Sequence, residues 1–373
     1  MKSCDVLIVG GGPAGSSCAW RLRQAGLDVI VMDRAGFPRD KVCAGWITPQ
    51  VIEDLEIDCD DYRRGRTFQA ITGFRTGVIG RTTEVETAYD RPVSFGIRRC
   101  EFDHYLLRRS EARLKLEMPL ATLERHGTRW VVNGAVTTPM VVGAGGHFCL
   151  VARQLNPALE RAPLVAAHEV ELPLDADTAA SWTTAPTMPE LYFCRDLSGY
   201  GWCFRKGQYV NIGLGRFGRS LPSASGEFLG FLRNRRKIPA GASWRWRGHA
   251  YLVSDPPRRR TVDAGVMLIG DAAGLAYPQS GEGIRPAIES GLLAASTLIE
   301  ARGCYTRGRL VAYEQRLKER FGRSDSLSRP ARSESSPLAR AIVPWLLDVP
   351  SFVRHVVLDR WFLHAHERAL ARV

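Results

Sequence analysis

The 373-residue sequence predicts an α/β fold in which a parallel, helix-covered sheet is interleaved with a second, mainly antiparallel sheet. Three uninterrupted apolar runs, at residues 6–9, 29–32 and 266–269, are typical of strands that are buried on both faces. A helical period at 16–25 connects the first two runs and ends at a glycine. From about 160 to 255 the pattern changes to alternating segments interrupted by Gly and Pro, which favours an antiparallel sheet.

The same patterns place the remaining elements. The periodicity predicts helices over 101–116 and 283–300. Two β-rich runs within 130–142 surround an Asn-Gly dipeptide, which is typical of hairpin turns. From about residue 309 the pattern is helical and is interrupted by prolines. A C-terminal helical segment is therefore expected beside the two sheets.

The charge balance is strongly basic, with a formal net charge of +12 and a pI near 9.5. Such a balance attracts polyanions, so nucleic acid and anionic membranes are the first partner classes to weigh. The basic residues are mostly arginines scattered among acids, and the short runs at 235–237 and 258–260 form no stripe interleaved with aromatic residues. We therefore expect no nucleic-acid partner, and attribute the charge to a solvated basic face or to an anionic ligand.

Cysteine usage indicates a reducing compartment. The nine cysteines are odd in number, form no CxxC pair, and have no histidine at a metal-ligand spacing. No metal site is expected. No signal peptide precedes the first motif, and no apolar run reaches the ~20 residues that span a bilayer. The expectation is a cytoplasmic protein, with peripheral membrane contact left open.

A glycine-rich turn directly follows the first apolar run. Gly10, Gly12 and Gly15 have the GxGxxG spacing, and Pro13 and Ala14 separate the last two. In this motif the first glycine permits a tight turn, the second lets backbone N–H groups approach a pyrophosphate, and the third lets helix pack on strand. The positive end of the helix dipole then faces the phosphates. The sequence therefore predicts a Rossmann-type βαβ unit that binds a dinucleotide.

An acidic residue ends the second strand of this unit. Asp33 lies 18 residues past Gly15, where a carboxylate binds ribose hydroxyls. Arg34 follows it, either as a clamp for a 2′-phosphate or as a solvated surface residue. Strand, glycines, helix, second strand and acid in this order are specific for dinucleotide binding, but they do not distinguish NAD from FAD.

A second motif, at residues 270–284, distinguishes between the two dinucleotides. The third apolar run leads into this motif, which is made of Gly270, Asp271, Pro278, Gly281, Gly283 and Ile284. This arrangement resembles the flavoproteins of the p-hydroxybenzoate hydroxylase superfamily, most closely the geranylgeranyl reductase family and its relatives, the flavin-dependent halogenases. The resemblance implies FAD, with Asp271 on the ribityl chain and the proline and glycine-rich helix start beside the isoalloxazine. A helix N-terminus at that place also stabilises negative charge on a reduced flavin.

Three further segments resemble this family. Residues 37–45 are similar to its FPRDKxCGG loop, which lies near the flavin, and they carry Cys43 with Ala44 where glycine is usual. Residues 99–103 resemble the helix start whose arginine, here Arg99, reaches the FAD pyrophosphate. Residues 199–204 resemble the YxWxFP segment of the substrate cavity.

The sequence also departs from the family pattern. Arg205 stands where the YxWxFP segment has proline, and the halogenase WxWxIP signature is absent. Gly145 stands where the superfamily's GADG motif has an aspartate that is associated with FAD and NAD(P)H binding. No second strand-linked GxGxxG exists. We therefore expect NAD(P)H to bind only transiently as electron donor, or another reductant or partner protein to supply the electrons.

Two enzyme functions follow from this resemblance. In the first, an FAD-dependent reductase gives a hydride to a C=C bond of an apolar substrate such as an isoprenoid or a quinone. In the second, an FAD-dependent monooxygenase hydroxylates an aromatic substrate, free or bound to a carrier or protein. The motifs do not separate the two because both need the same cofactor site, although the resemblance favours the reductase. A non-catalytic flavin-binding protein is the remaining alternative.

Three residues are candidates for catalysis. Cys43 is a candidate proton donor or redox modulator, or a small buried hydrophobic residue. Tyr200 and Trp202 are expected either to line the substrate cavity or to pack within the sheet. Arg39 and Lys41 belong to the same loop as Cys43, where they face an anionic group or solvent.

The C-terminal residues suggest an additional contact. Segments 341–347 and 351–363 combine apolar side chains with Arg354, His355 and Arg360. A basic amphipathic helix of this kind lies on an anionic membrane, docks a partner protein, or closes the substrate cavity. The oligomeric state is not predicted.

The predicted domains are discontinuous. The FAD-binding domain is expected to comprise 1–75, 96–158 and 256–303, and the β-sheet substrate domain 76–95 and 159–255. Residues 304–373 form the expected C-terminal helical region.

Overall fold

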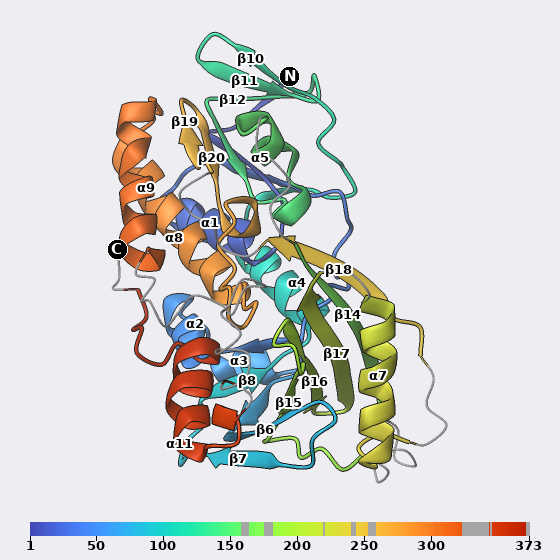
Figure 1. Cartoon of the computed structure of the whole chain (residues 1–373). Coiled ribbons are helices and arrows are strands. Elements are labelled where there is room, and N and C mark those ends of the chain that lie inside the picture. The colour runs from blue at the N-terminus through green and yellow to red at the C-terminus, as the bar shows by residue number, and fades with distance from the viewer. Residues whose placement is uncertain are drawn as a thin grey trace.

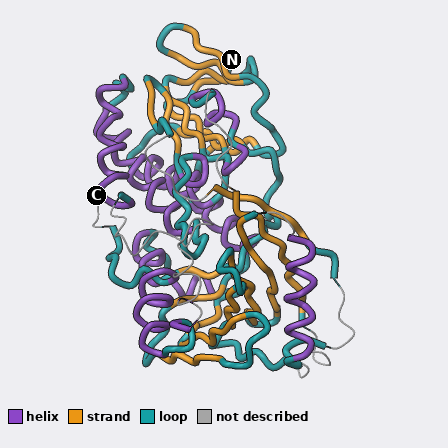
Figure 2. The backbone as a smooth tube through the Cα atoms, in the orientation of Figure 1, coloured by secondary structure: helices purple, strands orange, loops and turns teal. Residues whose placement is uncertain are grey.

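The structure is a computed structural model that describes residues 1–157, 164–174, 182–218, 221–239, 244–252, 259–322, 343 and 345–370. Two sheets lie in two adjoining regions of the molecule, with helices around them (Figures 1 and 2). This architecture confirms the predicted α/β fold. Prolines 330, 337 and 344 and arginine 258 lie outside the described residues.

The first sheet is the predicted parallel one. In the described residues its strand order is β19-β20-β13-β2-β3-β9, and only β19 runs antiparallel to its neighbour. Strands β2, β3, β13 and β20 are buried along their whole length, as uninterrupted apolar runs predict. The strands are β2 (Val6–Val9), β3 (Val29–Met32), β9 (Arg113–Lys115), β13 (Met140–Gly143), β19 (Val262–Asp263) and β20 (Val266–Leu268).

Helices α1 (Pro13–Gln24) and α8 (Ile284–Ala301) pack against each other beside this sheet. The contact is so close that a Cβ added to Gly291 would lie 2.4 Å from the carbonyl oxygen of Ala14. Helix α1 begins earlier than the predicted residue 16, because Gly12 is its N-cap and Pro13 takes the first helical position. Helix α9 (Arg307–Phe321) packs on α8.

The predicted helix over 101–116 is wrong in its second half. Helix α4 spans Arg99–Arg109, and the chain then turns at Glu111, whose φ is +51°. Residues 113–115 pair with β3 as the parallel edge strand β9. Local periodicity continues through the turn, so only the tertiary pairing with β3 separates helix from strand.

The predicted hairpin is confirmed. Strands β11 (Arg129–Val132) and β12 (Val136–Thr138) pair antiparallel on either side of Asn133 and Gly134, both at positive φ. They join β10 (Leu123–His126) and β1 (Lys2–Ser3) in a small four-stranded sheet. This sheet lies at the edge of the parallel sheet in Figure 1.

The second large sheet is mainly antiparallel, as predicted. Its order in the described residues is β18-β14-β17-β16-β15-β6-β7, with one parallel pair between β15 and β6. Helix α7 (Leu221–Asn234) packs on β14 and β17 (Figure 1). Strand β6 begins at Gly73, ahead of the boundary expected at 76. The strands are β6 (Gly73–Val78), β7 (Glu84–Ala88), β14 (Leu164–Pro173), β15 (Glu190–Phe193), β16 (Gly199–Lys206), β17 (Tyr209–Phe217) and β18 (Arg247–Leu252).

Short elements connect the two sheets. A three-stranded sheet joins β4 (Trp46–Ile47), β8 (Ser94–Gly96) and β5 (Gln69–Ile71). The short helices are α2 (Pro49–Asp54), α3 (Cys59–Arg63), α5 (Leu150–Leu155), η1 (Gly146–Phe148) and η3 (Gly270–Ala272).

The C-terminal segment packs on the second sheet. Helix α11 (Pro350–Phe352) continues into the π-helical η5 (Val353–Phe362), next to β7 (Figure 1). Val353, Val357 and Phe362 are buried in one cluster with side chains of the second sheet. The apolar side of the predicted helix is thus covered by the protein itself. No helix in the described part of the chain is long and apolar enough to cross a membrane.

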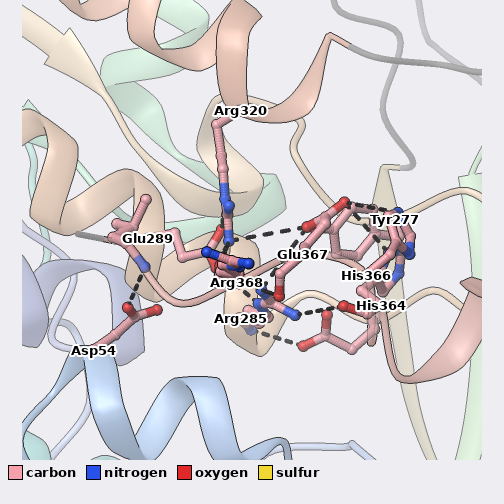
Figure 3. Close-up of polar contacts among 11 residues, drawn as sticks. Asp54, Tyr277, Arg285, Glu289, Arg320, His364, His366, Glu367 and Arg368 are labelled. Carbon is pink, nitrogen blue, oxygen red and sulfur yellow. Dashed lines mark hydrogen bonds and ion pairs between the residues drawn. The ribbon is translucent and has the colours of Figure 1, made fainter. Parts of the chain in front are cut away.

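A buried arginine connects this segment to the first sheet's helices (Figure 3). Arg285, in the first turn of α8, is 1% exposed and pairs with Glu289 at 2.7 Å. Its guanidinium also donates to the backbone carbonyls of His364, Glu367 and Arg368 at 3.3, 2.9 and 3.2 Å. The start of α8 therefore holds the C-terminal segment in place.

Further contacts surround this arginine. Arg320 on α9 donates to both oxygens of Glu289, at 2.7 and 2.6 Å, and so shares that carboxylate (Figure 3). The ring of Tyr277 stacks on His364 with centroids 3.6 Å apart, and its hydroxyl donates to Glu367 at 2.9 Å. Glu289 is therefore paired with two arginines, and Arg285 is the one that also holds the C-terminal carbonyls.

We therefore expect Arg285→Met to destabilise the protein by about 3–5 kcal/mol, because Glu289 stays buried and the tail carbonyls lose their donors. Chemical denaturation followed by circular dichroism measures this loss. The control is Arg316→Met, since Arg316 pairs with Glu300, which is 53% exposed. That change should cost no more than about 1 kcal/mol. Equal losses in both variants would contradict a special role for Arg285.

Candidate functional site

A crevice of about 860 Å³ lies where the two large sheets meet. Strands β2, β13 and β20 of the parallel sheet all end at it, because their next residues, including Gly10, Ala144 and Asp271, line its wall. Parallel α/β sheets bind ligands at the carboxyl ends of their strands. The glycine turn and the distant second motif thus share one continuous crevice, as predicted.

The glycine turn has the geometry of a phosphate cradle. Gly10 has a φ of +118°, and a Cβ there would lie 2.3 Å from the carbonyl oxygen of Ala144. A Cβ at Gly15 would lie 1.9 Å from the carbonyl oxygen of Gly10, so the third glycine serves helix packing and does not line the crevice. Pro13 and Ala14 start α1 at the crevice wall, so the helix N-terminus faces it.

Asp33 supports the same turn. Its Oδ2 accepts a hydrogen bond from the backbone N–H of Gly11 at 2.8 Å, and its Oδ1 accepts one from Ala35 at 2.8 Å. The carboxylate lines the crevice and retains lone pairs for ribose hydroxyls. Arg34 is exposed at the crevice wall.

Two arginines share one buried carboxylate next to the turn. Arg99 donates to Oδ1 and Oδ2 of Asp103 at 2.8 and 2.9 Å, and Arg39 approaches Oδ2 at 3.3 Å. Asp103 is fully buried, and both arginines line the crevice. Two guanidinium groups against one carboxylate leave a net positive charge, which suits an anionic ligand such as a pyrophosphate.

The second motif contributes an open acceptor. Asp271 lines the crevice, and its carboxylate accepts no hydrogen bond from the residues that the structure describes. Burial raises the pKa of this carboxyl, and the nearby charges of Lys41 and Arg99 oppose that rise. This partly buried acceptor is free to accept from hydroxyl or N–H donors of a ligand.

Lys41 and His249 form a pair that sequence patterns missed. Lys41 Nζ lies 2.6 Å from His249 Nε2, and both residues line the crevice. Burial lowers the pKa of Lys41 to about 8, and burial together with Lys41 lowers the pKa of His249 to about 3. The imidazole is therefore neutral at physiological pH and accepts a hydrogen bond from the ammonium group. His249 comes from β18, in a stretch without any motif, so no sequence signal pointed to it.

The start of α8 completes the crevice wall. Gly281, Gly283 and Ile284 line it, and Gly283 is the N-cap of the helix. Gly270 and Pro278 do not line it. Gly270 has a φ of +59° and would bring a Cβ within 3.0 Å of that of Ala14, so this glycine permits the close turn after β20.

Comparison with known proteins identifies the family. A family model described as FAD dependent oxidoreductase matches residues 5–86. The chain is 32% identical over 310 residues to the geranylgeranyl diphosphate reductase of Rhodobacter capsulatus, covering 78% of this chain and 74% of that protein. It is 30% identical over 354 residues to the menaquinone reductase of Mycobacterium tuberculosis, with 88% and 83% covered. The chain belongs to the geranylgeranyl reductase family of FAD-dependent oxidoreductases.

Solved structures agree on the fold of this geranylgeranyl reductase family member. A geranylgeranyl bacteriochlorophyll reductase-like protein from Thermoplasma acidophilum superposes with a TM-score of 0.78 at 23% identity, covering 94% of this chain and 92% of that one. A flavin-dependent brominase superposes with a TM-score of 0.71 at 17% identity, covering 97% and 93%.

The residues of the crevice suit the FAD of this family. The glycine turn, the start of α1 and the Arg39–Arg99 pair offer donors and positive charge for the pyrophosphate. Asp33 offers an acceptor to a ribose, and Asp271 offers one to the ribityl hydroxyls. The N-terminus of α8 lines the crevice together with Asp271 and would stabilise negative charge on a bound flavin. Arg39 and Lys41, expected from the sequence to face an anionic group or solvent, line the crevice, and the structure adds His249.

The candidate catalytic residues line the same crevice. Cys43 and Ala44 line it from the loop, and Tyr200 and Trp202 line it from β16. The Tyr200 hydroxyl donates to the backbone carbonyl of Ser280 at 2.5 Å, and Trp202 Nε1 donates to Asn211 Oδ1 at 2.6 Å. Both aromatic rings thus form walls, with their donors already engaged.

We expect Asp271→Ala to weaken FAD binding about tenfold or more, because a ligand hydroxyl loses a charged acceptor worth about 1.5–3 kcal/mol. Titration of deflavinated protein with FAD, followed by flavin fluorescence, measures the change. Asp263→Ala is the control, since Asp263 lies on β19, pairs with Arg260 and does not line the crevice. Unchanged FAD affinity in Asp271→Ala would overturn this assignment.

Proposed function

We propose that this family member is a reductase that saturates a C=C bond of an apolar isoprenoid or quinone-like substrate. Relatives carrying the names geranylgeranyl diphosphate reductase and menaquinone reductase support the substrate class. The main observation is that the crevice continues from the cofactor residues to an aromatic wall formed by Trp46, Tyr200 and Trp202. An apolar chain or ring beside the flavin would be shielded there from water.

The C-terminal segment reinforces this wall. The Phe362 ring lies 5.1 Å from that of Tyr200 and 6.2 Å from that of Trp46. Phe362 is fully buried, as is Phe204 beneath Trp46. The segment therefore closes the apolar end of the crevice from outside, which excludes solvent from a substrate bound there.

Bound FAD, once reduced by NAD(P)H or another transient donor, supplies a hydride equivalent. Saturation of a C=C bond also requires one proton on the second carbon. Cys43 carries the thiol that lines the crevice from the loop, and we assign it the role of proton donor. Its S–H bond breaks as the new C–H bond forms, and a solvent proton restores the thiol. The neutral His249 and the partly buried Lys41 also line the crevice and contribute polar groups to its wall.

We expect Cys43→Ala to lower kcat about 100-fold, in keeping with the loss of a general acid, with the FAD content unchanged. The measurement is single-turnover reduction of geranylgeranyl diphosphate or menaquinone by pre-reduced enzyme. Cys304→Ala is the control because Cys304 is exposed and remote from the crevice. Wild-type rates in Cys43→Ala would remove Cys43 from the mechanism without affecting the FAD site.

The second candidate is a monooxygenase. The fold is similar to that of a probable FAD-dependent monooxygenase from Pseudomonas aeruginosa, with a TM-score of 0.67 at 18% identity. This fold is therefore compatible with the second candidate. Photoreduction without oxygen, followed by oxygen addition, separates the two. Direct return of the oxidised flavin spectrum supports the reductase, and a long-lived intermediate spectrum supports the monooxygenase. A flavin that no donor can reduce would support a non-catalytic role.

We also propose that the C-terminal segment touches an anionic membrane peripherally. Trp345 is 69% exposed and Val349 41% exposed beside the exposed Arg354, on a chain of net charge +12. Trp345→Ser with Val349→Ser should reduce flotation with anionic liposomes. Val311→Ser, which alters a 43% exposed valine on α9, should not. Equal flotation of both variants with wild-type protein would contradict this contact.

A further inference from the structure

Two glutamates of β14 face the Cys43 loop from the second sheet. Glu169 and Glu171 lie two residues apart, so they point to the same side of the strand. Glu169 is 7% exposed, and Asn211 of the neighbouring strand β17 is fully buried beside it. Neither glutamate lines the crevice, so both act through the residues they touch.

Glu169 receives hydrogen bonds on both carboxylate oxygens. Oε2 accepts from the backbone N–H of Cys43, and Oε1 accepts from Asn211 Nδ2 at 2.9 Å. Two donors facing one carboxyl match its ionised form, which accepts on both oxygens. An amide or a neutral acid at this position would turn a donor toward one of them, leaving a buried donor unsatisfied.

Asn211 connects the loop to the aromatic wall. Its Oδ1 accepts from Trp202 Nε1 at 2.6 Å, while its Nδ2 also lies 3.3 Å from the carbonyl oxygen of Cys43. One amide therefore contacts both Trp202 and Cys43. Because the indole N–H of Trp202 can only donate, the Asn211 side-chain atom that faces it must be the carbonyl oxygen.

The neighbouring carboxylate is neutralised separately. Glu171 pairs with Lys206 at 2.7 Å and with Arg98 at 3.0 Å. Lys206 Nζ also donates to the carbonyl oxygens of Ala44 and Ile97 at 2.9 and 3.0 Å. The same network therefore holds the loop by Ala44 as well as by Cys43.

Burial and the charges around the two glutamates shift their pKa values in opposite directions. Burial raises the pKa of Glu169 to about 7, Glu171 adds to the rise, and Lys206, the Cys43 N–H and Asn211 oppose it. Although burial also raises the pKa of Glu171, Lys206 and Arg98 hold it below its usual range. Pairs of carboxyls whose environments divide their titrations in this way recur at functional sites.

We infer that Glu169 and Asn211 are positioning residues that set the place of Cys43 relative to Trp202 at the substrate end of the crevice. The inference rests on the proposed role of Cys43 in the reduction. Without these contacts the loop would lose its backbone anchor on the second sheet, and the thiol would shift from the reacting carbon. A misplacement of about 1 Å is enough to slow an enzymatic step about 100-fold.

The test changes one partner at a time. Glu169→Gln places an amide N–H₂ against either the Cys43 N–H or Asn211 Nδ2. Asn211→Asp places a carboxylate against those of Glu169 and Glu171, because Asn211 Nδ2 lies 2.9 Å from Glu169 Oε1 and 3.3 Å from Glu171 Oε1. We expect each change to lower kcat about 10- to 100-fold with the FAD content retained.

Alkylation of Cys43 by iodoacetamide in the holoenzyme, followed by mass spectrometry of its peptide, gives a readout independent of turnover. Both variants should change the labelling rate. The control is Glu190→Gln, an equally buried glutamate that bonds Arg75, Lys237 and Tyr192 on the far side of the sheet. It should lower stability without changing labelling or kcat.

Wild-type labelling and wild-type kcat in Glu169→Gln would overturn the inference. The pH profile adds a second criterion. Protonation of Glu169 as the pH falls through about 7 should lower wild-type kcat, and Glu169→Gln should lack this dependence. If Cys43→Ala proved fully active, the proposed proton donor would fail, yet the labelling experiment would still decide whether Glu169 positions the loop.

Discussion

Close backbone contact around the glycine turn is the constraint on which the rest of the structure depends. Gly15 lets α1 approach the carbonyl of Gly10, and Gly291 lets α8 approach the carbonyl of Ala14. Each approach is too short for any side chain, so the two helices and β2 form one rigid unit. The N-termini of both helices then line the same crevice, where they would stabilise negative charge on a bound FAD.

The crevice wall combines residues from both sheets, and the loop at 39–46 contacts elements of each, through Asp103 of α4 and Glu169 of β14. Residues 39–46 contribute Arg39, Lys41, Cys43 and Trp46 to the crevice wall. Buried polar groups of the second sheet fasten this loop through its backbone. Such a network is costly unless every member is satisfied, which explains why its donors and acceptors match so closely.

A similar arrangement holds the C-terminal segment. Its apolar side chains cover the second sheet, while Arg285 at the start of α8 binds its backbone carbonyls. The C-terminal segment therefore connects α8 to the aromatic wall that includes Trp46 and Tyr200. Its burial leaves only a few apolar side chains, such as Trp345, on the outside.

The sequence by itself determined the parallel βαβ unit, the antiparallel second sheet and most of the cofactor residues. These features depend on local rules: uninterrupted apolar runs, glycine spacing and an acid at a strand end. Gly10, Gly12, Asp33, Asp271 and Gly283 line the crevice because each follows a strand or starts a helix.

Only the tertiary structure decided the rest. Residues 113–115 form a strand and not the end of a helix, because pairing with β3 outweighs their local period. His249, Glu169 and Asn211 carry no motif, since their roles arise from contacts between strands far apart in the chain. Distances between such side chains depend on how two sheets pack together, and no local pattern encodes that packing.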